Sequence, residues 1–368
     1  IWIFDPFKKD KKYFENEDSR INVCRGITVF VDKYQNSFIF YANGSKLFKF
    51  NLKDGEPDLS FGNKGYVDLH IGLGENSNSL FVTMTSPGVI YKNLIIVGSS
   101  VSEGNPAAKG NIRAFDANSG DLIWVFKTIP EIGEEGYESY DDSNAFRRLG
   151  GANAWAGLTL DEERGILYAP TGSVSYDFYG GDRVGDNLFA NSIIALDALN
   201  GKKIWHFQTV HHYVWDRDLP TPPVLFDYKV NDTIIPSLAQ VTKSGYIFLL
   251  NRINGKPIYE IKEKDVPSNS KLVGEVLSKT QPIPSFPDAF SRQSFTDNDI
   301  NPFVSINERD SLLKVLSSIS KEDVFSPPSE QGTLIFPGFD GGAEWGGPAL
   351  DPVNNKLYIN SNEMPWIL

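Results

Sequence analysis

Ile194-Ala-Leu-Asp-Ala-Leu-Asn-Gly-Lys-Lys-Ile-Trp205 contains a pattern that returns along the chain: a short apolar run, an Asp, a turn ending in Gly, and an aromatic residue four positions later. The apolar run, the turn with glycine where positive φ is needed, and the second run together predict a β-hairpin. The aromatic that ends the second strand, Trp205, is expected to pack flat between neighbouring sheets. The pattern therefore predicts one hairpin of a repeating sheet structure.

The same pattern occurs in other segments of the chain. They are Leu47–Gly55, Ile112–Trp124 and Phe248–Tyr259. Trp124 and Tyr259 stand at the same offset from their glycines as Trp205 does from its own. Trp2 matches the end of a further copy whose start is missing. Self-similarity of this kind is typical of repeat architectures.

A second pattern, in which an Asp opens the turn, alternates with the first in Leu158–Ala169 and Pro348–Ile359. It also predicts hairpins. Recurring hairpins bounded by aromatic residues predict an all-β fold, a β-propeller of four-stranded blades. The chain holds roughly five blades' worth of sequence, whereas a propeller closes into a ring. We therefore expect residues 1–368 to be a single propeller domain that is truncated at both ends.

Segment 262–328 interrupts the repeat, since it is long, contains prolines and shows little periodicity. Only Arg309–Ser318 has apolar residues at helical spacing. We expect this segment to be an insertion that covers one face of the propeller rather than a separate domain. The acidic stretch Glu131–Asp142 is expected to form a solvated loop.

Composition excludes several classes of function. A formal net charge of -12 argues against nucleic acid as a partner, because phosphate binding needs a basic face. A single cysteine excludes an internal disulfide and a Cys-x-x-Cys-His haem site within the chain. No apolar run approaches the ~20 residues of a membrane span. Membrane contact is therefore expected only through regions outside these residues.

The loop Trp205–Pro220 carries three of the four histidines, two tryptophans and two aspartates. Together with other motifs it resembles the pyrroloquinoline quinone (PQQ) dependent dehydrogenases, specifically their glucose dehydrogenase branch. The other motifs are Cys24-Arg-Gly26, Gly151-Ala-Asn-Ala-Trp155, Thr242-Lys-Ser-Gly245, Ser326-Pro-Pro-Ser-Glu-Gln-Gly332 and Gly342-Ala-Glu-Trp-Gly-Gly347.

The resemblance implies an eight-bladed propeller with PQQ and a divalent cation, calcium or magnesium, on its axis. It implies an oxidoreductase of the periplasm that oxidises the CH–OH group of a sugar or another alcohol. Electrons would pass to a quinone or to cytochrome c.

The resemblance also assigns roles to individual residues. PQQ is a flat tricarboxylated quinone, so its site needs an aromatic platform and cations. Trp155 would stack on the ring, Lys243 would bind the quinone oxygens, and Arg25 would pair with a carboxylate or the reacting oxygens. Asp216 would take the substrate's hydroxyl proton while hydride passes to the quinone. Further cofactor neighbours would be Thr85, Ser100, Glu344 and Trp345.

Each of these residues also has a structural alternative. Trp155 would be a hydrophobic plug between blades, Lys243 an exposed lysine at a strand end, and Arg25 one half of a surface ion pair. The metal ligands implied by the resemblance are Glu103, Ser173 and Asp216. A serine hydroxyl is a poor ligand, so backbone oxygens, Thr171 or water are alternatives to Ser173.

The sequence also departs from the family's pattern. A lone Cys24 leaves no disulfide ring against the cofactor, such as the alcohol-oxidising branch has. Ile21 stands where the glucose branch has a histidine, and Tyr213 stands where that branch has an aspartate. Substrate identity is therefore open. His211 and His212 are expected to be structural, because calcium prefers oxygen ligands.

Two other functions remain open at this stage. One is a non-catalytic propeller that acts as an assembly or interaction scaffold, and the other is a sugar-binding module without redox chemistry. A scaffold has no reason to bring Trp155, Asp216 and Lys243 together, and a sugar-binding module needs exposed aromatics but no base. The spatial arrangement of these three side chains therefore separates the hypotheses.

Overall fold

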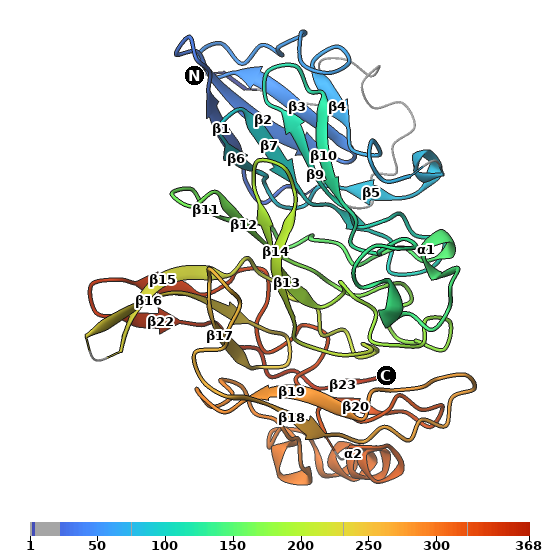
Figure 1. The fold of residues 1–368 in the computed structure, drawn as a ribbon. Helices are drawn as coiled ribbons and strands as arrows, with labels where there is room; N and C mark the ends of the chain where they lie inside the picture. Colours follow the sequence, from blue (N-terminus) through green and yellow to red (C-terminus); the bar gives the residue numbers. More distant parts are fainter. Residues whose placement is uncertain (1, 4–22, 75, 231, 322) are drawn as a thin grey trace.

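Three four-stranded antiparallel sheets follow one another along the N-terminal part of the chain (Figure 1). The computed structural model describes residues 2–3, 23–74, 76–230, 232–321 and 323–368. The first sheet contains β1 (Thr28–Val31), β2 (Ser37–Asn43), β3 (Lys46–Asn51) and β4 (Tyr66–Asp68). The second contains β6 (Val89–Tyr91), β7 (Leu94–Val97), β9 (Ile112–Asp116) and β10 (Leu122–Phe126). The third contains β11 (Thr159–Asp161), β12 (Ile166–Pro170), β13 (Ser192–Asp197) and β14 (Lys203–Gln208).

The other described strands form smaller sheets. A three-stranded sheet contains β15 (Val224–Val230), β16 (Thr233–Val241) and β17 (Ile247–Asn251). The two-stranded pairs are β5 (Val82–Thr83) with β8 (Ser100–Val101), β18 (Ile261–Asp265) with β19 (Thr280–Pro284), β20 (Leu334–Ile335) with β23 (Trp366–Ile367), and β21 (Ala349–Asp351) with β22 (Lys356–Tyr358). The helices are α1 (Ala145–Arg148), α2 (Ile306–Ser318) and the 3-10 turns η2 (Ser77–Ser79), η3 (Tyr137–Ser139) and η4 (Asp297–Asp299).

Hairpins are present in four of the predicted segments: Ile112–Trp124, Ile194–Trp205, Leu158–Ala169 and Pro348–Ile359. After β3 and β17 the turn is followed by a single bridge, Phe50 with Pro57 and Leu250 with Pro257, instead of the predicted second strand. The glycines of these turns explain how adjacent sheets dock. Gly201 has φ 71° in the turn between β13 and β14. A Cβ atom added there would lie 2.5 Å from the ring of Trp124 in the preceding sheet. A Cβ on Gly255 would likewise lie 2.7 Å from the ring of Trp205. Only glycine leaves room for the indole, so each of these tryptophans packs on the turn of the next sheet, as predicted.

Two copies of the repeat lie at the margins of this pattern. Trp2 also packs on a glycine turn, since a Cβ on Gly55 would lie 2.4 Å from its ring. Its indole Nε1 donates to the carbonyl of Leu52 at 2.9 Å. Tyr259 differs from the prediction, because its ring packs against Phe286, with centroids 4.6 Å apart. The packing of an aromatic ring on a glycine turn is therefore seen for Trp2, Trp124 and Trp205, and it changes at Tyr259, just before segment 262–328.

Hydrophobic cores lie between neighbouring sheets. Ile95 and Ile96 on β7 illustrate this, because successive strand residues point to opposite faces. Ile95 packs in a cluster with Phe40 of the first sheet, and Ile96 packs in a cluster with Leu167 of the third. Both isoleucines are fully buried. The second sheet thus buries one face against the first sheet and the other against the third.

Segment 262–328 contains the helix predicted from its periodicity. Helix α2 begins after Ser305, whose side chain accepts from the Glu308 amide while the Glu308 carboxylate accepts from the Ser305 amide. This capping box fixes the start of the helix. The helix lies below the β18–β19 hairpin in the view of Figure 1, and its buried Leu316 packs with Leu334 of β20. Among the described residues, no helix is long and apolar enough to cross a membrane.

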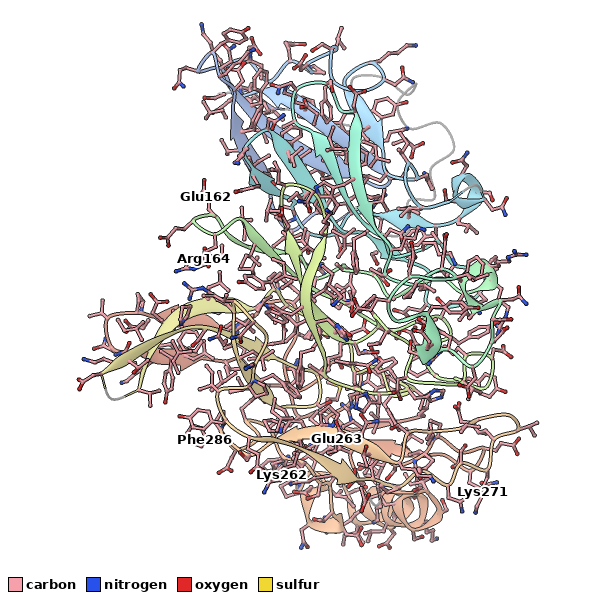
Figure 2. All side chains as sticks on the ribbon, in the orientation of Figure 1. Glu162, Arg164, Lys262, Glu263, Lys271 and Phe286 are labelled. Carbon is pink, nitrogen blue, oxygen red and sulfur yellow. The ribbon has the colours of Figure 1, made fainter. Side chains whose placement is uncertain are left out.

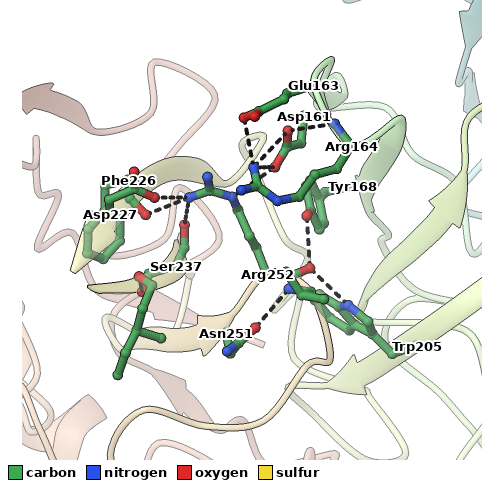
Figure 3. Close-up of polar contacts among 12 residues, drawn as sticks. Asp161, Glu163, Arg164, Tyr168, Trp205, Phe226, Asp227, Ser237, Asn251 and Arg252 are labelled. Carbon is green, nitrogen blue, oxygen red and sulfur yellow. Dashed lines mark hydrogen bonds and ion pairs between the residues drawn. The ribbon is translucent and has the colours of Figure 1, made fainter. Parts of the chain in front are cut away.

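A buried arginine ties the third sheet to the fourth (Figure 3). Arg252 Nε donates to Asp161 Oδ2 at 2.9 Å, and its Nη1 donates to Asp227 Oδ1 at 2.9 Å and to the Phe226 carbonyl at 2.7 Å. The carbonyl oxygen of Arg252 accepts from the Trp205 indole at 3.1 Å. Arg252, which directly follows β17, therefore binds Trp205 as well as the third and fourth sheets.

Arg252→Ala is expected to lower the free energy of unfolding by about 3–5 kcal/mol, because it leaves the buried Asp161 carboxylate without its closest buried cation. Arg164→Ala is the matched control, since Arg164 also pairs with Asp161 but is 32% exposed, and its loss should cost much less than that of Arg252 because solvent screens exposed ion pairs. Urea unfolding measures both variants. Equal losses in the two would contradict a specific role for Arg252.

Candidate cofactor site

The candidate residues lie outside the strands, in loops and turns at their ends. Arg25 precedes β1, Trp155 precedes β11, Asp216 lies between β14 and β15, and Lys243 follows β16. Asp216 has φ 52°, a backbone conformation that residues other than glycine seldom adopt and that clusters at functional sites. The loop therefore turns sharply at the residue that the sequence singled out as a base.

Lys243 and Asp216 form a direct ion pair at the centre of the site. The Lys243 Nζ lies 2.8 Å from Asp216 Oδ1 and 3.4 Å from Glu344 Oε1. Burial alone would lower the Lys243 pKa, but the neighbouring carboxylates, Asp216 first, raise it above its ordinary value. The ammonium group is therefore charged at neutral pH. Tyr213 also donates its hydroxyl to Asp216 Oδ1, at 3.1 Å.

Trp155 is fixed to the same loop through Asp218. Its indole Nε1 donates to Asp218 Oδ2 at 2.9 Å, and the Ser173 amide donates to Oδ1 at 2.9 Å. Burial raises the pKa of Asp218 to about 6, although the charge of Lys243 opposes this shift. Thr85 donates its hydroxyl to the Trp155 carbonyl at 3.1 Å. Hydrogen bonds thus hold Trp155 both at its ring nitrogen and at its backbone carbonyl.

Two cations share the face of Trp155. The Arg25 Cζ lies 5.5 Å from the centre of the Trp155 ring and 4.9 Å from that of Trp345. Lys243 Nζ lies 6.0 Å from the centre of the Trp155 ring. Cations over indole faces are attracted by the ring quadrupole. The site therefore offers an aromatic platform with positive charge above it.

A cavity of about 440 Å³ lies beside this platform. It is lined by Glu103, Gly104, Tyr176, Asp177, Phe178 and Tyr179. Ser173 donates its hydroxyl to Asp177 Oδ1 at 2.6 Å. Burial, reinforced by the charge of Asp218, raises the pKa of Asp177 well above its usual range. Desolvation and the charge of Asp216 raise the pKa of Glu103 as well. The cavity wall is thus acidic near Asp216 and aromatic further out.

The structure brings Trp155, Asp216 and Lys243 together, along with most of the residues predicted as their neighbours. Arg25, Thr85, Glu344 and Trp345 are all linked to them by the contacts given above. Ser100 is different: it pairs with Thr83 across β8 and β5, and its side chain has no hydrogen bond to another site residue in the described part of the chain.

The predicted metal ligands lie in the same region but do not form a ready-made cage. The charge of Asp216 raises the pKa of Glu103, and the Ser173 hydroxyl donates to Asp177. Across the described ranges, no group of three or more His, Cys, Asp or Glu side chains is arranged to hold a metal ion. The metal set therefore stays a prediction.

Three site residues were missed or given a lesser role by the sequence reasoning. Asp218 was expected from the sequence to be structural, since the prolines that follow it make a regular strand unlikely, and the structure shows it as the acceptor that positions the Trp155 indole. Asp177 carried no recognisable signal, because it lies in an irregular loop after β12. Tyr213 was noted only as a departure from the family, although its hydroxyl contacts Asp216.

The donor set suits a flat tricarboxylated cofactor. Such a group needs an aromatic face and cations for its carboxylates. Trp155 supplies the face, and the Arg25 guanidinium and the Lys243 ammonium lie within 6.0 Å of its centre. Carboxylate oxygens of the kind that a divalent cation prefers lie nearby, on Glu103 and Asp216, although they do not form a ready-made coordination group in the described part of the chain.

Trp155→Phe is expected to lower the free energy of unfolding by about 1–3 kcal/mol, because it keeps an aromatic face but removes the donor to the buried Asp218 carboxylate. Trp345→Phe is the matched control, because Trp345 is 55% exposed and should be near neutral. Unfolding in urea compares the two. No loss in Trp155→Phe would show that Asp218 does not depend on the indole N–H.

Comparisons with known proteins find similar sequences along the whole chain. The family model described as "PQQ: Glucose/ethanol/alcohol dehydrogenase, beta-propeller domain" matches residues 1–368. The chain is 32% identical to quinoprotein glucose dehydrogenase A of Acinetobacter calcoaceticus, over 100% of this chain and 47% of that protein. It is 33% identical to quinate/shikimate dehydrogenase (quinone) of Acinetobacter baylyi, over 88% of this chain and 40% of that protein. The chain thus spans about half the length of these relatives or less.

Solved structures show the same fold at lower sequence identity. Quinohemoprotein alcohol dehydrogenase from Comamonas testosteroni has a TM-score of 0.64 at 21% identity, covering 93% of this chain and 44% of its own. A europium-containing methanol dehydrogenase has a TM-score of 0.63 at 17% identity, covering 93% of this chain and 53% of its own.

Proposed function

The chain belongs to the family of PQQ-dependent glucose/ethanol/alcohol dehydrogenase β-propellers, and we propose that it carries the catalytic site of a quinoprotein that oxidises a sugar or another alcohol hydroxyl. The observation that carries this proposal is the Lys243–Asp216 ion pair beside the face of Trp155. A platform, a cation and a carboxylate from three separate loops have no reason to meet in a scaffold.

The chain's own residues then have defined tasks. Bound PQQ would accept a hydride from the substrate carbon, and a divalent cation would polarise the quinone carbonyl. Trp155 provides the stacking face, which Asp218 holds in place. Arg25 and Lys243 neutralise the cofactor's negative charge. Asp216 removes the hydroxyl proton of the substrate, as a positioned general base.

Asp216 is suited to this task by its hydrogen bonds. Both donors seen in the structure, Lys243 Nζ and the Tyr213 hydroxyl, reach its Oδ1 atom. Among the described residues no hydrogen bond reaches Oδ2, so this oxygen is the one left to accept a proton. Glu103, with Asp216 and oxygens near Ser173, would hold the calcium or magnesium ion.

The wider setting of the proposal follows the family. Each four-stranded sheet is taken as one blade of an eight-bladed ring that is incomplete within residues 1–368, with segment 262–328 as a cover. A periplasmic location is proposed, with a quinone or cytochrome c as electron acceptor. Among the relatives, one is named for a quinone and another is a quinohemoprotein.

Reduction of an electron-accepting dye by the full protein tests the proposal. The protein is supplied with PQQ and calcium and offered a panel of sugars and alcohols, with omission of PQQ as the control. Dye reduction that requires both PQQ and one class of substrate is the expected result. Failure with every substrate, despite bound PQQ, would favour a non-catalytic scaffold.

A further inference from the structure

His212 and Glu275 form a buried pair outside the residues assigned above. The His212 Nε2 lies 2.7 Å from Glu275 Oε1, and the two side chains are 1% and 0% exposed. The second carboxylate oxygen, Oε2, accepts from the Gly180 amide at 2.7 Å. Glu275 therefore connects three segments: the β18–β19 connection, the loop after β12, and the loop after β14.

Both ring nitrogens of His212 have a partner. Its Nε2 lies 2.7 Å from Glu275 Oε1, and its Nδ1 lies 2.8 Å from the Gly185 carbonyl oxygen. The contact between His212 and Glu275 is shielded from solvent, because both side chains are buried. A Cβ on Gly180 would lie 2.3 Å from His212 Nε2, so only glycine allows this approach.

The pair adjoins the wall of the cavity. Tyr176 to Tyr179 line that cavity, and Gly180 follows them directly. The Tyr179 hydroxyl donates to the Val273 carbonyl at 2.6 Å, two residues before Glu275. The wall is therefore attached to the β18–β19 connection at two consecutive residues.

The same cluster reaches the loop that carries Asp216. Arg183, which is fully buried, donates to the Tyr176 carbonyl at 2.8 Å and also to the Tyr213 carbonyl. The hydroxyl of Tyr213 in turn donates to Asp216. The charge of Arg183 also faces Glu275. Glu275 is thus connected both to the cavity wall, through Gly180, and to the loop that carries Asp216, through His212.

We propose that the His212–Glu275 pair is a latch that holds the Tyr176–Tyr179 wall and the Asp216 loop against the β18–β19 connection, and so sets how tightly the substrate binds. The role is one of positioning, because neither residue lines the cavity. It rests on the proposed function in assigning the cavity to the substrate.

The test compares Glu275→Gln with Glu263→Gln. An amide keeps the volume of Glu275 but removes its negative charge, so charge-assisted hydrogen bonds to His212 and the Gly180 amide become neutral ones of about half the strength. Glu263, labelled on β18 in Figure 2, makes the matching contact to the neighbouring His211 at 3.2 Å and is 52% exposed. Tyr179→Phe is a second variant, which breaks the Val273 contact without changing any charge.

Amide hydrogen exchange of the full protein, measured without PQQ, tests whether the His212–Glu275 pair holds these segments in place. Glu275→Gln and Tyr179→Phe are expected to speed exchange of the amides in residues 176–180 and 272–277, and Glu263→Gln is not. Unchanged exchange in both latch variants would overturn the proposal. Because this measurement needs no cofactor, it decides the latch even if the protein reduces no dye.

Steady-state kinetics of the holoenzyme test the expected effect of the latch on substrate binding. In Glu275→Gln, kcat/KM is expected to fall on the order of 10- to 100-fold through a raised KM, with kcat changed much less, since a misplaced binding wall costs this much. Glu263→Gln should match the wild type. A fall in kcat at unchanged KM, or a loss of equal size in Glu263→Gln, would overturn the proposal.

Discussion

Replacement of Asp216 by asparagine is expected to lower kcat by roughly 10²- to 10⁴-fold, the range supplied by a positioned general base. The amide cannot take up the substrate's proton, but it still accepts from Lys243 and the Tyr213 hydroxyl, whose donors lie 2.8 and 3.1 Å from Oδ1. Removing a negative charge beside Lys243 should leave the affinity for the anionic PQQ intact. The expected signature is therefore normal cofactor binding with little turnover.

Parallel measurements separate these two effects. PQQ binding is followed by titration of its absorbance, and turnover by dye reduction at saturating substrate. Asp54→Asn is the control, since Asp54 is an exposed turn residue in the loop that follows β3. Wild-type turnover in Asp216→Asn would remove the base assignment, whereas loss of PQQ binding would mean that Asp216 mainly holds the cofactor or its cation.

Lys243→Met is expected to weaken PQQ binding by 2 kcal/mol or more, about 30-fold, because it truncates one partner of a buried charged contact. It should also lower the free energy of unfolding by about 3–5 kcal/mol, since the Asp216 and Glu344 carboxylates lose their shared cation. The raised pKa of Lys243 means that this charge is present over the whole neutral range.

Two further variants interpret this result. Lys243→Arg keeps the charge and should recover much of the stability and part of the PQQ affinity. Lys92→Met removes an exposed lysine and should change neither. PQQ binding by Lys243→Met at wild-type strength would place the cofactor away from this residue, and the assignment of Lys243 would be wrong.

The repeating hairpins were predictable because their signals are local. A glycine turn with a tryptophan four residues later was enough to predict that Trp124 and Trp205 pack between sheets, whereas their partners, Gly201 and Gly255, are known only from the structure. The change at Tyr259 was not predictable, since it depends on Phe286, in a segment without periodicity.

The site was predictable only in part, for a physical reason. Resemblance indicated Trp155, Asp216 and Lys243, but the contacts among them depend on where three loops lie in space. Asp218 was set aside because the following prolines argue against a strand. The loop is indeed irregular, and the turn at Asp216 brings the Asp218 carboxylate to the Trp155 indole. Asp177 could be identified only from the structure, because its burial beside Ser173 is what distinguishes it from other aspartates in loops.

A crystal structure of the full protein with PQQ and calcium tests the central claim most directly. The account predicts electron density for the quinone stacked on Trp155, with Arg25 and Lys243 at its oxygens and the Asp216 carboxylate facing the cavity. Density for the cofactor elsewhere on the protein, with the Lys243–Asp216 pair undisturbed, would contradict it.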